Sequence, residues 1–219
     1  MKSQDILILL KLVSLQKQTR REVKKGQQGA NWIEESKEYF PPDWQGWEDD
    51  LHEAQQELDG IPQFEERYSL RGLQSLTGIS KTEISASLKR SIAVGMAMHD
   101  RKTGYPKANT KALLEFAVHG LKYVFPVKPA EIVRGIPTSF AAPVMEGKLM
   151  TAGEMICVWP DARGNSKGQA VKPLYKSVPK AVKLDPDLYE LLALVDAIRL
   201  GNSREAKLAE QLLADKLKI

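Results

Sequence analysis

Apolar residues recur at helical spacing on both sides of a short polar turn between residues 68 and 92. Spacings of three and four residues place such side chains on one face of a helix. Gly78 can adopt the positive φ that ends a helix, and Ser80 can cap the helix that follows. The pattern therefore predicts two short helices packed together across a tight turn. The positions that define the two apolar faces are Leu70, Leu73 and Leu76, then Ile84, Leu88 and Ile92.

Two helices joined in this way have the layout of a helix-turn-helix. The stretch resembles the winged helix-turn-helix regulators of bacteria and archaea, broadly of the MarR-like kind. The resemblance covers roughly residues 68–110, with a helix over 3–25 as support. It implies that the second helix begins at Lys81 and reads double-stranded DNA. The matching features are the leucine stripe, GIS at 78–80, Lys81-Thr82-Glu83, Ile84 and SLKR at 87–90.

A hairpin is expected directly after the second helix. Residues 97–99 and a later extended piece can form two strands around the basic turn Arg101-Lys102-Thr103-Gly104. In the family that the stretch resembles, this hairpin is a wing whose basic tip reaches DNA beside the second helix. A plain surface hairpin is the alternative interpretation.

The candidate DNA contacts lie on the second helix and on the expected wing. Side chains opposite Ile84 and Leu88 are candidates for base edges and nearby phosphates, and the others for the DNA backbone. The first set is Lys81, Thr82, Ser85 and Lys89, and the second is Arg90, Arg101, Lys102 and Lys107.

Further helices are predicted on both sides of this stretch. Residues 3–25 carry an apolar stripe wide enough for the core of the chain, for a homodimer interface or for both. Residues 26–66 read as an acidic insertion, mostly loop with at most a short helix over 33–39, then a helix over 46–59. Residues 109–123 return to helix, and 123–127 are a strand candidate.

The remainder of the chain consists of short strands and turns, followed by two helices. Residues 154–160 read as a strand, and 162–184 form a basic stretch that we interpret as a loop. Asp185 can cap a helix that starts at Pro186, and a last helix follows Ser203.

The fold class that we predict is mainly α with small β elements (α+β). A winged helix-turn-helix domain would cover residues 1–128, including the acidic insertion 26–66. A C-terminal extension over 129–219 would hold short strands and then two helices.

The net charge of +4 hides a strongly uneven distribution. Residues 34–66 carry a formal charge of −11, whereas residues 67–134 carry +8. Charge runs are usually solvated faces. Here the positive excess coincides with the stretch that would contact DNA, where neutralising phosphates supplies affinity.

Residue patterns typical of catalysis are missing. His52, His99 and His119 stand apart, without the HExxH pattern of zinc enzymes, and the single Cys157 permits no intrachain disulfide and no cysteine-based zinc site. We therefore expect no enzyme activity, no metal and no cofactor. The longest apolar run is far below the roughly 20 residues that span a bilayer, and no signal peptide is evident, so we expect a cytoplasmic protein.

Two functions fit these observations. The first is a transcriptional regulator that binds double-stranded DNA, as a homodimer. The second is an antitoxin-like protein that neutralises a partner encoded nearby and autoregulates its operon. The pattern after residue 110 resembles regulator-like proteins found beside nucleotidyltransferase-type partners, which implies that residues 110–219 would grip the partner.

Overall fold

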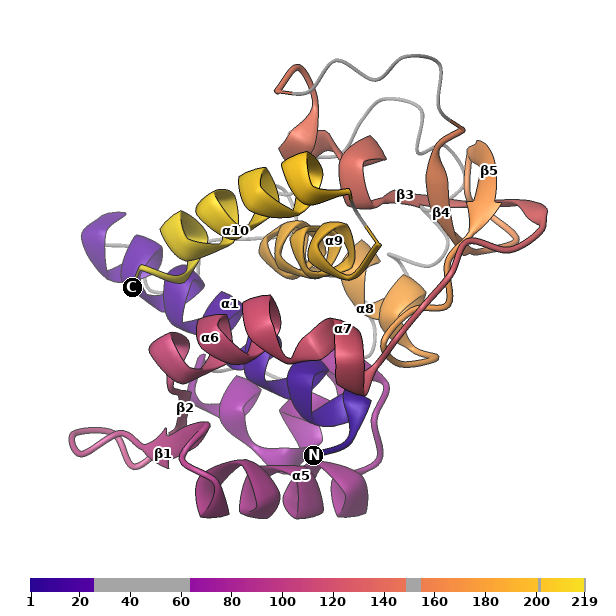
Figure 1. The fold of residues 1–219 in the computed structure, drawn as a ribbon. Helices are drawn as coiled ribbons and strands as arrows, with labels where there is room; N and C mark the ends of the chain where they lie inside the picture. Colours follow the sequence, from indigo (N-terminus) through magenta and orange to yellow (C-terminus); the bar gives the residue numbers. More distant parts are fainter. Residues whose placement is uncertain (26–63, 149–154, 201, 219) are drawn as a thin grey trace.

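The computed structural model describes residues 1–25, 64–148, 155–200 and 202–218 (Figure 1). These residues are mainly helical with small β elements, as expected. The predicted helices 33–39 and 46–59 lie outside the described residues. The longer helices are α1 (Ser3–Lys25), α4 (Leu70–Thr77), α5 (Lys81–Ala93), α6 (Thr110–His119), α9 (Pro186–Leu200) and α10 (Ser203–Leu217).

Short helical turns and strands complete the described chain. The short helices are η1 (Phe64–Tyr68), α7 (Leu121–Val124), η2 (Ser139–Ala141), η3 (Pro143–Met145) and α8 (Val178–Lys183). The strands are β1 (Ala97–His99), β2 (Pro106–Ala108), β3 (Ile132–Thr138), β4 (Cys157–Pro160) and β5 (Ser166–Ala170).

Helix α1 lies at the centre of the hydrophobic core. Residues 4–15 are all buried, and the helix contacts α4, α5, β2 and α9. The apolar side chains of residues 6–15 are therefore covered within one chain. Because residues of α9 such as Leu191 belong to the same core cluster as Leu9 and Leu73, the core is continuous across the expected domain boundary at 128/129.

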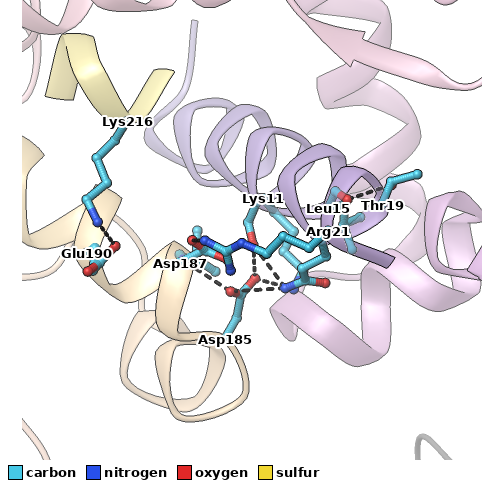
Figure 2. A network of polar contacts seen from close by, with 11 residues as sticks. Lys11, Leu15, Thr19, Arg21, Asp185, Asp187, Glu190 and Lys216 are labelled. Carbon is cyan, nitrogen blue, oxygen red and sulfur yellow. Dashed lines mark hydrogen bonds and ion pairs between the residues drawn. The ribbon is translucent and has the colours of Figure 1, made fainter. Parts of the chain in front are cut away.

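Two ion pairs, one of them buried, join α1 to the start of α9 (Figure 2). The Lys11 ammonium lies 2.7 Å from the Asp185 carboxylate, and both side chains are at most 1% exposed. Asp185 also accepts the Leu188 N–H at 3.0 Å, which confirms its predicted role as the cap of α9. Arg21 donates two hydrogen bonds to Asp187, at 2.8 and 3.1 Å.

The pKa values of Asp187 and of the nearby Lys17 are shifted at this contact between α1 and α9. Burial and the neighbouring Asp185 carboxylate raise the pKa of Asp187, against the opposing influence of Arg21. Burial also lowers the pKa of the nearby Lys17 ammonium.

Strands β3, β4 and β5 close into a small barrel. β3 pairs antiparallel with both β4 and β5, which pair parallel with each other. Glycines permit this tight closure: a Cβ on Gly135 would lie 2.0 Å from the Trp159 carbonyl oxygen, and one on Gly168 would lie 2.3 Å from that of Ile156.

The barrel is tied to α9 through the buried Asp196. Its carboxylate accepts hydrogen bonds from Trp159 Nε1 at 2.6 Å and Thr138 Oγ1 at 3.2 Å, and Arg199 Nη1 donates at 2.5 Å. Burial raises the pKa of Asp196, while these donors act in the opposite direction.

Two sequence interpretations are wrong. Residues 123–127 do not form a strand, because Tyr123 and Val124 belong to α7, with helical hydrogen bonds from Val124 N to Gly120 O and from Phe125 N to Leu121 O. The basic stretch 162–184 is not one loop, since it contains β5 and α8. Its Lys183 is buried and pairs with Asp161 at 3.0 Å.

Candidate nucleic-acid interface

Helices α4 and α5 are joined by a tight turn at residues 78–80. Gly78 has φ +66°, and its N–H donates to the Gln74 carbonyl to close α4. The Ser80 hydroxyl accepts the Glu83 N–H at 3.4 Å and so caps α5. Both roles were predicted from the sequence, because each depends only on residues close along the chain.

One face of α5 is covered and the opposite face is open. Ile84 is fully buried, and Ser87 and Ser91 are buried as well. The candidate contacts at Lys81, Thr82 and Lys89 are exposed, and Ser85 is half-buried. The sequence pattern therefore separated the two faces of this helix correctly.

Arg90 is already engaged within the chain. Its guanidinium donates to Asp5 of α1 at 2.7 and 3.1 Å. Burial alone would raise the pKa of the Asp5 carboxyl, but hydrogen bonds from Arg90 and the Lys2 N–H outweigh it and hold that pKa below its usual value. Arg90 thus fastens α5 to α1, and its contact with the DNA backbone stays a prediction.

Strands β1 and β2 form the expected hairpin directly after α5. Ala97 pairs with Ala108, Met98 with Lys107 and His99 with Pro106. The Asp100 carboxylate holds the connecting turn by accepting the N–H groups of Thr103 and Lys102, and these bonds lower its pKa. The turn exposes the cations of Arg101 and Lys102, while Lys107 on β2 is half-buried.

Two apolar side chains on this surface were not among the predicted contacts. Val94 at the end of α5 is 61% exposed, and Met98 on β1 is 48% exposed. The alternation of a strand predicts that Met98 points away from the buried Ala97. That signal was available in the sequence.

A separate open cavity of about 450 Å³ lies between the barrel and the start of α10. Ser139 in its lining has φ +57°, and its buried hydroxyl makes no hydrogen bond to the described residues. The lining residues are Pro129, Ser139, Phe140, Met155, Cys157, Gln169, Leu200, Asn202 and Glu205.

The histidines in the described ranges suggest no chemistry. His99 Nδ1 lies 3.1 Å from the Gly104 carbonyl oxygen, within the hairpin. His119 is exposed at the end of α6. Within the described ranges, no three His, Cys, Asp or Glu residues are grouped as metal ligands, and no helix is long and apolar enough to cross a membrane.

No protein-family model, curated protein or solved structure matches this chain.

Proposed function

We propose that this protein is a DNA-binding transcriptional regulator, in which α4, α5 and the β1–β2 hairpin act as a winged helix-turn-helix. The observation that carries the proposal is the open face of α5, where Lys81, Thr82 and Lys89 are exposed while Ile84 on the other face is buried. The hairpin that follows adds two exposed cations in its turn. A helix with such a face fits the major groove.

In this arrangement α5 is the recognition helix and the hairpin is the wing. Lys81, Thr82, Ser85 and Lys89 contact base edges and nearby phosphates. Arg101, Lys102 and Lys107 contact the DNA backbone, and the +8 charge of residues 67–134 favours association. Because residues 4–15 of α1 are buried inside the chain, a homodimer would use another surface. Light scattering of the free protein would show whether its mass is that of a dimer.

The first test is a gel shift with DNA from upstream of the protein's own gene. We expect binding that weakens steeply with salt, because each neutralised phosphate releases counterions. Absence of binding at 50 mM salt would refute the proposal.

A matched pair of variants locates the contact surface. Lys81→Ala/Lys89→Ala should lower the affinity at least about ten-fold, with an unchanged melting temperature, since both side chains are exposed. The control Arg204→Ala/Lys207→Ala removes the same charge from exposed positions of α10, which lies far from α5 (Figure 1). If both variants bind like the wild type, the DNA surface lies elsewhere.

Exposed apolar side chains favour the second candidate function, neutralisation of a protein partner. Tyr123 is 73% exposed, Val124 51% and Ile132 51%, all within residues 110–219. Exposed aromatic and aliphatic side chains are frequent in protein interfaces. Co-expression with the product of the adjacent gene tests this function, and two well-expressed proteins that never co-purify would contradict it.

A further inference from the structure

The open face of α5 changes character toward its C-terminal end. Ser85, Lys89 and Ala93 follow one another at four-residue spacing and therefore lie along one side of the helix. The stripe is polar up to Lys89 and becomes apolar at the exposed Ala93 and at Val94, which is 61% exposed.

The apolar surface continues onto the hairpin. Gly95, with φ +73°, turns the chain immediately after Val94. Met98 then points outward from β1 and shares a face with its partner Lys107, because paired residues lie on the same side of a sheet. Val94 and Met98 thus bridge the end of α5 and the start of the hairpin.

Cations flank this apolar pair along the chain. Lys89 precedes it on α5, and Arg101, Lys102 and Lys107 follow it on the hairpin. A protein-binding patch is usually depleted of lysine. An apolar patch among cations matches DNA, whose phosphates border thymine methyl groups and the apolar faces of deoxyribose.

We propose that Val94 and Met98 form an apolar contact to DNA between the recognition helix and the wing, against thymine methyl groups or deoxyribose carbons. This inference rests on the proposed function. It adds a component of affinity that does not depend on charge.

Salt dependence separates this contact from the phosphate contacts. Val94→Ala and Met98→Ala should each weaken binding about three- to ten-fold at every salt concentration, with the slope of log K against log salt unchanged. Arg101→Ala/Lys102→Ala should instead reduce the magnitude of that slope by about 1 to 2. Tyr123→Ala, at another exposed position, is the control and should bind like the wild type.

The outcomes distinguish the two claims. If the wild type binds no DNA, the proposed function fails. A second outcome is that the wild type binds DNA and Lys81→Ala/Lys89→Ala weakens this binding, while Val94→Ala and Met98→Ala leave it unchanged. In that case the proposed function stands and only the apolar contact is refuted. The apolar contact is also refuted if Val94→Ala and Met98→Ala change only the slope of log K against log salt.

Replacing thymine by deoxyuridine in the bound DNA identifies the contacted group. If the contact is to a methyl group, the wild type weakens on deoxyuridine DNA and Val94→Ala or Met98→Ala causes no further loss there. If the contact is to deoxyribose, the variant loses the same factor on both DNAs. Either result supports the inference.

Discussion

At the scale of single residues, Ser139 combines two unfavourable features. It is the non-glycine residue with positive φ in the described chain, and its buried hydroxyl makes no hydrogen bond to the described residues. A left-handed conformation costs an L-residue about 1–2 kcal/mol, and an unsatisfied hydroxyl adds to that cost. The position therefore lowers stability at the wall of the cavity.

Ser139→Gly should relieve the backbone cost. After the greater entropy of glycine in the unfolded chain is subtracted, we expect a gain of about 0.5–1 kcal/mol in the free energy of unfolding. Ser139→Ala is the matched control, because it removes the hydroxyl and keeps the unfavourable φ. Urea denaturation compares the three proteins, and equal midpoints for the Gly and Ala variants would contradict the expectation.

Asp5 is coupled to the proposed interface through its ion pair with Arg90 of α5. Its folded pKa lies below the usual aspartate value of 3.8, so its contribution to stability is complete above that value. The contribution is lost as the pH falls through the lower, folded pKa. The raised pKa values of Asp187 and Asp196 have the opposite effect on stability. Ionisation of these two carboxyls disfavours the folded state, and this cost is removed as the pH falls from their folded pKa toward their pKa in the unfolded chain.

Asp5→Asn isolates this effect. The variant should be less stable than the wild type at pH 7, since Arg90 loses its partner, and the difference should shrink below about pH 4. Thermal unfolding between pH 7 and pH 3 measures it. A difference that stays constant over this range would show that Asp5 does not titrate as described.

At the scale of elements, the sequence predicts features that depend on neighbouring residues and does not predict contacts between distant ones. Gly78, Ser80 and Asp185 end or cap their helices through neighbours within a few residues, so the sequence alone predicted them. The pairing of Arg90 with Asp5 spans 85 residues. The barrel depends on close backbone approaches at Gly135 and Gly168, which no local pattern indicates.

One such distant contact supports the α4–α5 turn from outside. The Ser177 hydroxyl, at the start of α8, does not cap its own helix but donates to the Thr77 carbonyl. A Cβ added to Gly78 would lie 3.0 Å from Ser177 Cβ. The turn is thus held both by its own conformation and by α8.

Gly78→Ala should cost more stability than Gly104→Ala. Both positions have positive φ, +66° and +73°, which costs about 1 kcal/mol or more for alanine, but a Cβ at Gly104 meets open space. The excess for Gly78→Ala measures the contact with α8. Chemical denaturation of both variants measures the two losses of unfolding free energy. Equal losses would mean that α8 moves aside to accept the added Cβ without a loss of stability.

At the scale of the whole molecule, α1 and α9 are linked across the domain boundary expected at 128/129. Lys11 and Asp185 are separated by 174 residues and are both buried. A lysine that faces the apolar core cannot be paired with a distant carboxylate from sequence alone. The continuous core and this ion pair make the two parts of the chain depend on each other.

Lys11→Met tests this dependence. It leaves the Asp185 carboxylate buried without its cation, which costs about 3–5 kcal/mol of unfolding free energy. Lys216→Met removes a partner of Glu190 whose side chain is 30% exposed, and should cost less than about 1 kcal/mol. Similar losses of unfolding free energy for the two variants would show that the buried Lys11–Asp185 pair contributes no more than the partly exposed pair.

The central position of α1 also affects the order of events during synthesis. α1 leaves the ribosome before α9, which covers part of it and whose cap, Asp185, pairs with Lys11. At ordinary translation rates α9 emerges roughly 10–40 s after α1. Until then, the apolar surface of α1 lacks this cover and can recruit chaperones. A nascent chain therefore completes the packing around α1, to which Arg90 fastens α5, only after α9 has been made.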